Sequence, residues 1–196
     1  MSFRSPFAAL LLILLAATPA LALELRLPAE CKLGVDCFLQ QFPDMKSGDG
    51  AVDPFCGIAT YEDHDGVDLR VLSMTDIERG VPVVAVADGE VLRGRDGVED
   101  RLIRTPAERK AIMPKACGNG VIVAHAGGLE TQYCHLRRGS VTVKPGQMLK
   151  AGDKIGEIGA SGLAQFPHVH LTVRIHGKEV DPLTGRTVGG GCIDNR

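Results

Sequence analysis

Two histidines, His168 and His170, are separated by one residue in the segment "PHVHLTV" at positions 167–173. The segment is rich in β-branched residues, so we expect a strand, in which alternate side chains share a face. The two imidazoles would then lie on one face, with Val169 on the other. Imidazoles placed together can bind a metal ion or transfer protons. Two histidines on the solvated face of a half-buried strand would give the same pattern without any chemistry.

A second candidate pair, His64 and Asp68, lies in "YEDHDGVDLR". In a strand or extended loop, a spacing of four residues returns both side chains to the same side, and Gly66 between them permits a bend. Imidazole and carboxylate are both good zinc ligands. Taken alone the pair is weak support for a metal site, because polar residues of these types are commonly exposed.

A further candidate, His135, follows Cys134 in "TQYCHL" at the end of an expected strand. Together the three segments supply enough ligands for a three-residue metal site with two further imidazoles nearby. Metal sites that keep one position open for water in this way are the catalytic type. The other two histidines, His125 and His176, lie next to expected turns, and we expect them to be structural or solvated.

Strands and tight turns must position these residues. The chain has 24 Gly, 11 Pro and no Trp, which together with its valine-rich segments predicts many short strands and little helix. The segment "VPVVAVADGEVLRG" predicts a hairpin with its turn at Asp88-Gly89, and "CGNGVIVAHAGGLETQYCHL" predicts a hairpin around "AGG". A turn at His176-Gly177 is expected to join "HVHLTVRI" to "KEVDPL". The pattern therefore predicts an all-β fold with one antiparallel domain.

The first 22 residues have the features of an export signal. Arg4 precedes the apolar run "PFAALLLILLAA", and the small residues "ALA" at 20–22 end it. The apolar stretch is short for a bilayer span and is interrupted by Pro19, so we expect cleavage and no membrane span afterwards; an uncleaved anchor is the alternative. Removal leaves 174 residues, enough for one domain with a sizeable core.

The rest of the chain divides into three segments. Residues 23–55 lack sustained periodicity and are expected to form an N-terminal extension, residues 56–185 the β domain, and residues 186–196 a C-terminal tail. The formal net charge of the whole chain is −2 at pH 7. Such a balance gives no electrostatic basis for binding nucleic acid.

All six cysteines lie beyond the expected signal. An even number in an exported chain favours disulfides over thiol chemistry, and the chain has no Cys-x-x-Cys spacing typical of a metal site. Six cysteines allow 15 pairings. Cys117 and Cys134 lie near opposite ends of one expected hairpin and can be bridged. The other two pairs are then a guess: Cys31 with Cys37 and Cys56 with Cys192.

Five spaced motifs run from about Tyr61 to Pro182: "HDGVD", "GVPVVAVADGEV", "GNGVIVAHAGGLETQYCHL", "VKPGQMLKAGDKIGEIGASG" and "PHVHLTV". In this order, with the glycine turns between them, they resemble the lysostaphin-like, or LytM-type, zinc metallopeptidases that cut peptide bonds in peptidoglycan. The resemblance implies an antiparallel β-sheet or β-sandwich core of the LytM type, described as a duplicated hybrid motif or barrel-sandwich, with long loops.

Carried over residue by residue, the resemblance implies a site for one zinc ion per chain. His64, Asp68 and His170 match the three metal ligands, while His168 and His135 match two histidines that flank the metal-bound water without binding the metal. Three protein ligands leave a fourth position for water, whose pKa zinc lowers to about 7. Since no His-Glu-x-x-His helix supplies a base, the two non-ligand histidines are expected to orient the water, move its proton or stabilise the oxyanion.

Two features depart from the family pattern. The family usually follows His-x-His with Phe-Glu, where this chain has Leu171-Thr172; we expect altered surroundings and the same zinc chemistry. Residues 94–116 are charged and poorly patterned, and they predict a long insertion between strands with room for one helical turn. Either this insertion or an N-terminal extension folded over the groove would change substrate choice, and the second would make the enzyme latent.

The resemblance and the expected signal together imply an exported zinc endopeptidase, in the periplasm of a Gram-negative bacterium, that hydrolyses stem-peptide cross-links in peptidoglycan. Two alternatives stay open. A catalytically silent module of the same fold would bind peptidoglycan or activate another cell-wall hydrolase, although such members typically lack the ligands that are present here. A lipoyl- or biotinyl-like hammerhead would need a modifiable lysine at a tight hairpin tip, and the "ADG" turn has none.

Overall fold

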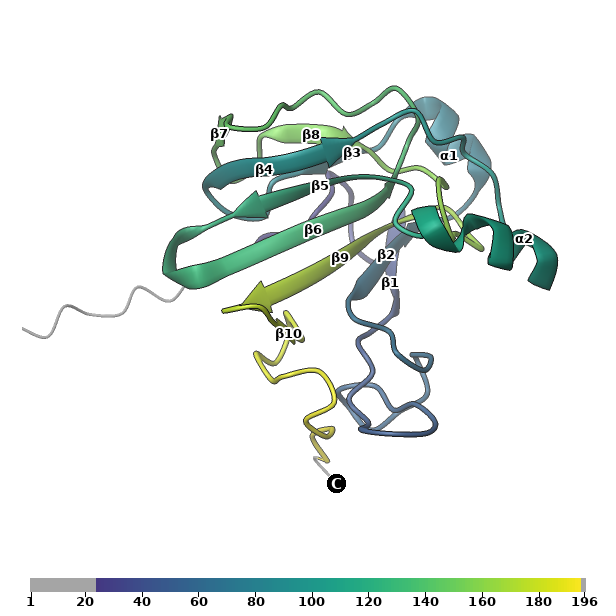
Figure 1. Cartoon of the computed structure of the whole chain (residues 1–196), viewed down its shortest axis with the longest axis vertical. Helices are drawn as coiled ribbons and strands as arrows, with labels where there is room; N and C mark the ends of the chain where they lie inside the picture. Colours follow the sequence, from purple (N-terminus) through teal and green to yellow (C-terminus); the bar gives the residue numbers. More distant parts are fainter. Residues whose placement is uncertain (1–23, 195–196) are drawn as a thin grey trace, which may run out of the picture.

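An antiparallel sheet of eight strands dominates the computed structural model of this chain, which describes residues 24–194 (Figure 1). The expected export signal at 1–22 therefore lies outside the described residues. The strands are β1 (Cys37–Gln41), β2 (Val67–Val71), β3 (Pro82–Val84), β4 (Gly89–Arg95), β5 (Asn119–Ala124), β6 (Leu129–Leu136), β7 (Met148–Leu149), β8 (Lys154–Glu157), β9 (His168–Ile175) and β10 (Lys178–Val180). The helices are α1 (Met74–Arg79) and α2 (Pro106–Ile112), with short 3-10 turns η1 (Met113–Lys115) and η2 (Ala126–Gly128). The predicted all-β class with long loops is confirmed.

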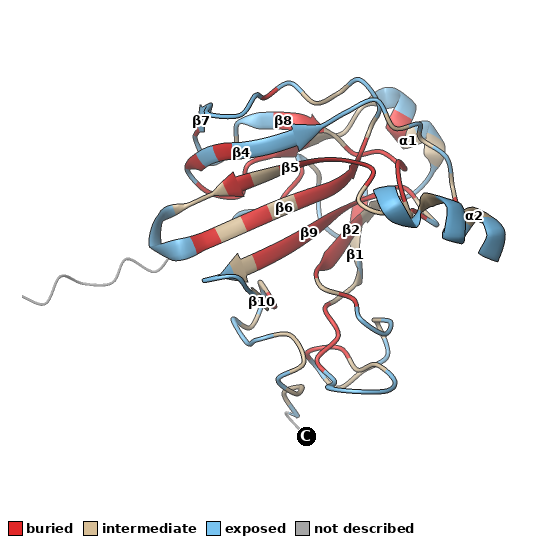
Figure 2. Ribbon diagram, viewed as in Figure 1, coloured by how far each residue is buried: buried red, intermediate tan, exposed pale blue. Residues whose placement is uncertain are grey.

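The large sheet has the strand order β1-β2-β9-β6-β5-β4-β7, with β10 paired to β9, and β3 and β8 form a second sheet of two strands. One apolar cluster fills the space between the sheets and includes Val169, Leu171 and Val173 of β9. Figure 2 shows the buried residues running along β2, β6 and β9. Because side chains alternate along a strand, His168 and His170 lie on the opposite face of β9 from this core.

Tyr133 of β6 joins the core to the chain segment after β3. Its ring is fully buried, and its hydroxyl accepts a hydrogen bond from the backbone N–H of Val86 at 2.9 Å and another from the Thr131 hydroxyl at 3.3 Å. Burial raises the pKa of the Tyr133 hydroxyl to about 12, although the two hydrogen bonds act to lower it. The hydroxyl is therefore protonated at neutral pH and is a structural acceptor inside the core.

The hairpin predicted around Asp88-Gly89 was wrong. Strand β3 pairs with β8, whereas β4 pairs with β5 and β7. Residues 85–87, between β3 and the turn, are buried. The backbone at this point already has other partners, since Val84 N–H at the end of β3 donates to the carbonyl of Pro28 and Ala85 N–H donates to that of Asp153. The chain therefore crosses from one sheet to the other at this turn. The other two turns are confirmed, since β5 pairs with β6 and β9 pairs with β10.

The insertion at 94–116 holds more helix than the single turn expected. Helix α2 begins with a capping box, in which Thr105 Oγ1 accepts from Glu108 N–H while the Glu108 carboxylate accepts from Thr105 N–H. Pro106 occupies the first turn, where a missing N–H costs nothing. The helix buries none of its residues and stands out from the sheet (Figures 1 and 2). Local capping rather than core packing therefore defines its start.

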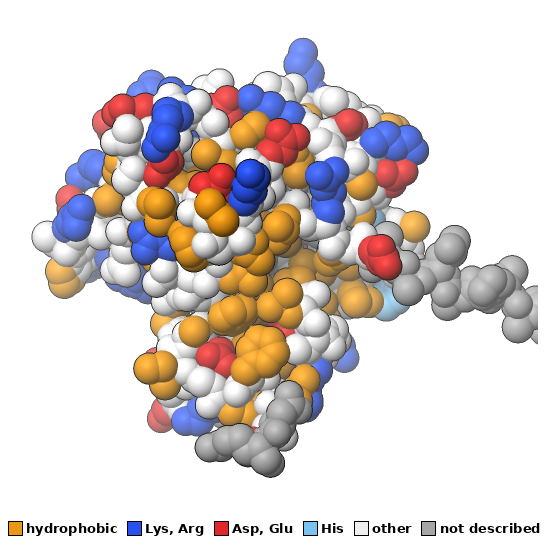
Figure 3. Space-filling model, turned by 180° about the vertical axis from the view of Figure 1, so that it is seen from behind, with side chains coloured by type: hydrophobic (Ala, Val, Ile, Leu, Met, Phe, Trp, Pro, Cys, Tyr) orange, Lys and Arg blue, Asp and Glu red, His pale blue; other side chains and the backbone are white. Residues whose placement is uncertain are grey.

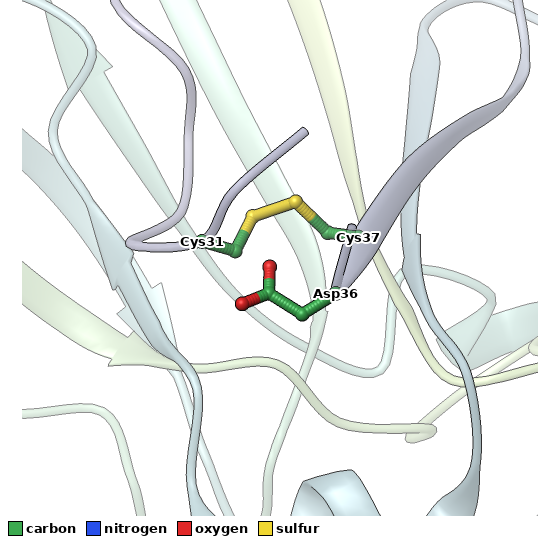
Figure 4. A group of neighbouring side chains, drawn as sticks. All are labelled: Cys31, Asp36 and Cys37. Carbon is green, nitrogen blue, oxygen red and sulfur yellow. A yellow bond between two sulfur atoms is a disulfide. The ribbon is translucent and has the colours of Figure 1, made fainter. Parts of the chain in front are cut away.

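All three predicted disulfides are confirmed, and the six cysteines leave no free thiol. Cys31 and Cys37 lie close to Asp36, as Figure 4 shows, but their sulfurs are bonded to each other, so this cluster is not a thiolate metal site. The bond brackets the start of β1, which pairs with β2 at the edge of the large sheet. The expected N-terminal extension thus contributes a strand to the fold.

Below the large sheet, residues 42–64 and 181–194 form a lower lobe (Figure 1). The two segments are joined by Gly189 N–H bonding to the carbonyl of Asp44, by Gly191 N–H bonding to that of Met45, and by the Cys56–Cys192 disulfide. From behind, hydrophobic side chains gather between this lobe and the sheets (Figure 3). Within residues 24–194, no helix has the length and apolar character required to cross a bilayer.

Replacing Tyr133 by Phe should destabilise the fold by about 1–3 kcal/mol, because the buried Val86 N–H loses its acceptor. Denaturant unfolding of the two proteins measures the difference. Thr187→Val removes an exposed hydroxyl that forms no hydrogen bond within residues 24–194 and is the matched control, expected within about 0.5 kcal/mol of the parent. Equal stability of the Tyr133 variant and the parent would contradict the role given to this hydroxyl.

Candidate metal centre

The pairing of β2 with β9 brings three candidate residues together. Asp68 of β2 lies directly opposite His170 of β9, and His64 lies just before β2. His64 Nε2 is 3.2 Å from Asp68 Oδ1 and 3.2 Å from His170 Nδ1, while His170 Nδ1 is 2.9 Å from Asp68 Oδ1. All three side chains are buried. The even spacing of His64 and Asp68 therefore brings both side chains to one side, as the sequence predicted.

These three atoms fit one metal ion. Ligand atoms bound tetrahedrally at about 2.0–2.1 Å lie about 3.3 Å from one another, and the three observed distances are 2.9–3.2 Å. Two imidazole nitrogens and one carboxylate oxygen are a donor set that zinc uses. Among residues 24–194, only one other group of this kind is found, and it contains the disulfide-bonded Cys31 and Cys37.

Backbone and ring contacts fix the orientation of His64. Its Nδ1 lies 2.6 Å from the carbonyl oxygen of Phe42, an atom that can only accept, so Nδ1 carries the proton and Nε2 presents its lone pair to the other ligands. Tyr61 stacks on the His64 ring with a centroid distance of 4.4 Å. Burial, followed by the negative charges of Asp68 and Asp65, raises the pKa of Tyr61, so its hydroxyl keeps its proton at neutral pH.

Gly66 lies in a bend directly before β2, as expected, and it also has a steric role. A Cβ at this position would lie 2.4 Å from the carbonyl oxygen of Leu171 and 2.8 Å from Nε2 of His170. Any larger residue would thus push β9 and its histidine away from β2. A glycine is required here because the backbone approaches the candidate ligand His170 closely.

The second ring nitrogen of His170 is held by a carboxylate and a hydroxyl. Nε2 lies 3.0 Å from Asp65 Oδ1 and 3.0 Å from Thr172 Oγ1, and the Thr172 hydroxyl is 3.4 Å from Asp65 Oδ2. Arg174, two residues further along β9, approaches the same Asp65 oxygen at 3.7 Å. A carboxylate on the far nitrogen of a histidine ligand fixes the tautomer that leaves Nδ1 free for a metal.

The charges around His170 favour a cation. Burial acts to lower the pKa of His170, but the hydrogen bonds to Asp65 and Asp68 and their charges outweigh it and raise the pKa to about 9. Burial likewise acts to raise the pKa of Asp68, but hydrogen bonds from His170 and His64 hold it well below its usual value. Asp68 is therefore an anion, which is the form that binds a metal.

His168 and His135 lie beside the three candidate ligands. His168 Nε2 is 3.6 Å from Asp68 Oδ1, and the rings of His135 and His168 have centroids 4.5 Å apart. In each ring Nδ1 donates to a backbone carbonyl: His135 to Ser161 at 2.7 Å, and His168 to Phe166 at 2.8 Å. Nε2 of each imidazole is then free to accept a proton.

Burial lowers the pKa of both residues. For His135 the neighbouring histidines His168 and His170 add to the burial effect, and its pKa falls well below the usual value. The Asp68 charge partly opposes the effect of burial on His168. Both shifts favour the neutral imidazole at neutral pH, which is the form that acts as a base.

His135 is held in an unusual backbone conformation. Its φ of 62° lies in the left-handed region, which a non-glycine residue occupies only when its surroundings impose it. Its N–H donates to the carbonyl of Cys117 at 2.8 Å, and the preceding Cys134 is bonded to the same Cys117 by a disulfide. The disulfide therefore helps to fix a candidate catalytic side chain.

A groove runs on both sides of the candidate ligands. A cavity of about 320 Å³ includes His170 and Thr172, and a second of about 470 Å³ includes His168 and Arg109 of α2. Tyr61 and Leu163 line both cavities and mark the position where they meet. The 94–116 insertion thus contributes a side chain to this groove, as expected for a segment that shapes it.

The structure brings His64, Asp68, His135, His168 and His170 together and leaves the other two histidines elsewhere. His125 is bonded to the carbonyl of Asp88 and to Thr131, and His176 lies in the turn between β9 and β10. Sequence reasoning missed the contact of Asp65 with His170. Its position inside "HDGVD" was the available signal, but only the fold shows that it approaches β9.

Replacing Asp65 by Asn should weaken zinc binding about 10- to 100-fold, because the amide oxygen accepts less strongly from the far nitrogen of His170. Competition with a chromogenic chelator measures the affinity. Glu62→Gln removes an equal charge from an exposed neighbour that does not contact His170, and should bind zinc as the parent does. Equal losses in the two variants would mean that general charge, rather than this contact, sets the affinity.

Comparison with known proteins gives relatives among cell-wall peptidases. The DD-carboxypeptidase/endopeptidase Mpg of Neisseria meningitidis is 31% identical over 126 residues, covering 64% of this chain and 23% of that protein. The peptidoglycan DD-endopeptidase ShyB of Vibrio cholerae is 32% identical over 120 residues, covering 61% of this chain and 22% of that protein. The chain thus spans less than a quarter of the length of these relatives.

A solved structure shares the fold of this chain, and a family model matches most of its length. A chain of the SpoIIQ-SpoIIIAH pore forming complex superposes with a TM-score of 0.57 at 20% identity, covering 84% of this chain and 92% of that chain, which supports the fold alone. Residues 62–182, more than half of the chain, match the family described as peptidase family M23. The resemblance to LytM-type peptidases is confirmed, and this chain belongs to peptidase family M23.

Proposed function

We propose that the protein is a zinc endopeptidase that hydrolyses peptide cross-links in peptidoglycan. The observation that carries the proposal is the meeting of His64 Nε2, Asp68 Oδ1 and His170 Nδ1 within 3.2 Å of one another, beside two further buried imidazoles in an open groove. Membership of the M23 peptidases supports peptide hydrolysis. The names of the relatives in Neisseria and Vibrio support peptidoglycan as the substrate.

The chain's own residues would divide the work between binding and proton transfer. When bound, zinc makes water acidic enough to supply hydroxide at neutral pH and polarises the carbonyl that is attacked. His64, Asp68 and His170 would hold the ion. His135 and His168, neutral and with Nε2 free, would accept the proton from water and return it to the leaving amine. The protonated hydroxyl of Tyr61 can donate a hydrogen bond to substrate in the groove.

Export would bring the enzyme to its substrate. The three disulfides suit an oxidising compartment, and the sequence features of residues 1–22 suit a cleaved signal. We therefore propose the periplasm of a Gram-negative bacterium as its location, with residues 23–55 as an extension, 56–185 as the peptidase domain and 186–196 as a tail. The substrate would be the stem peptides of the cell wall.

Substituting any of the three ligands by Ala should abolish both stoichiometric zinc and hydrolysis, because two remaining ligands bind the ion too weakly. Zinc content of the purified chain and mass spectrometry of muropeptides released from sacculi measure the two losses. His176→Asn, which changes a histidine in a turn away from the site, should keep both properties. Full activity in a variant that lacks a ligand would disprove the proposal.

Substituting His135 or His168 by Ala should leave zinc bound but lower the turnover number by about 10²- to 10⁴-fold, since general acid–base catalysis contributes about that much. The same two assays separate this result from loss of the metal. Zinc-loaded parent protein that binds sacculi without releasing muropeptides would instead support a silent binding module.

A further inference from the structure

The floor of the groove continues across the large sheet beyond the metal centre. Thr172 of β9, which contacts His170, is the first member of a row of directly opposed residues on neighbouring strands. The row consists of Thr172, Gln132, Ile122 and Arg93. Opposed residues in a sheet project to the same face, so this row leads from the candidate ligand His170 on β9, across β6 and β5, to β4 (Figure 1).

A third cavity lies at the β4 end of this row. It has a volume of about 230 Å³ and is lined by Arg93 and Arg95 together with residues of β5 and β6. Cys117 and Gln132 line both this cavity and the one beside His170, so the two are contiguous. A substrate lying across the strands from the metal centre would therefore reach the two arginines.

The two arginines give the far end of the groove an unbalanced positive charge. Among residues 24–194, neither Arg93 nor Arg95 forms an ion pair with a carboxylate. The nearby Asp96 carboxylate accepts from the backbone N–H groups of the 139–141 loop instead. At the other end, Asp65 is engaged with His170. The β4 end of the groove therefore carries two arginines whose charge no neighbouring carboxylate within residues 24–194 offsets.

Arg95 is held in place before any substrate arrives. Its Nε donates to the carbonyl of Gly118 at 2.6 Å, next to the Cys117–Cys134 disulfide, so its two terminal nitrogens keep their donors for another partner. A guanidinium presents these donors in a planar fork that matches a carboxylate. Holding the side chain beforehand lowers the entropy lost on binding.

We infer that Arg93 and Arg95 form a subsite that binds a carboxylate of the peptide substrate; this inference rests on the proposed function. Three strand spacings of about 4.8 Å separate β9 from β4, so the subsite lies about 14 Å from the metal centre. An extended chain covers that distance in about four residues. The bound carboxylate therefore lies about four residues along the peptide from the bond that is cleaved. The subsite selects peptides with a free carboxylate over amidated ones.

The test compares two substrates with the zinc-loaded full-length mature chain: purified cross-linked muropeptide dimers with free carboxylates, and the same dimers after amidation of those carboxylates. The parent should cleave the free-carboxylate dimers with a kcat/KM about tenfold higher, mainly through KM. The R93Q/R95Q variant should lose this preference and cleave both substrates at the parent's amidated rate. R95K, which keeps the charge but lacks the fork, should lie between the two.

Arg138→Gln removes an exposed arginine of the loop after β6, outside these cavities, and should keep the preference of the parent. Zinc content equal to that of the parent shows that each variant is folded at the metal centre. If the parent cleaves both dimers equally, or the double variant keeps the preference, the subsite is overturned and the proposed function stands. If the parent cleaves neither dimer, the proposed function fails and the inference fails with it.

Discussion

The site depends above all on the register between β2 and β9. Asp68 lies opposite His170 in this antiparallel pair, while Leu69 and Val169 face the core one residue further along. A slip of one residue would move every side chain of β9 to the other face. The apolar core and the candidate metal centre are therefore fixed by the same pairing, and burying the core residues of β9 forces its histidines onto the groove face.

Backbone carbonyls set the chemistry that the register makes possible. Three backbone carbonyls, those of Phe42, Ser161 and Phe166, each accept a hydrogen bond from the Nδ1–H of one imidazole. His64, His135 and His168 therefore present Nε2 to the groove. His170 is the exception. Its Nε2 contacts the Asp65 carboxylate, so its Nδ1 is the atom that lies among the candidate ligand atoms. Loops far apart in the sequence thus decide which nitrogen is available. The Cys117–Cys134 disulfide stabilises one of these positions by fixing the strand end at His135.

The local sequence pattern predicted most residues of the candidate site, but it predicted the pairing of the strands less well. Strand alternation correctly placed His168 and His170 on one face, and hairpin reasoning paired Cys117 with Cys134. Family resemblance selected the residues that the fold brings together. The prediction of a hairpin at Asp88-Gly89 was wrong because a turn sequence does not determine which strands the flanking segments pair with. The contact between Asp65 and His170 joins residues 105 positions apart, and no spacing rule applied to one segment could reveal it.

The charge distribution links the candidate metal centre to the strands of the groove floor. Asp65 and Asp68 bring two carboxylates to one buried imidazole, and a metal ion held by Nδ1 of His170 would take the place of the proton that Nδ1 donates to Asp68. Binding of a metal at this candidate site would therefore be coupled to proton release. Arg174 also contacts Asp65, and it pairs with Glu130 on β6 and Glu179 on β10. The carboxylate that contacts the candidate ligand His170 is thus held by the sheet itself, and strands that form the groove floor also support the candidate metal centre.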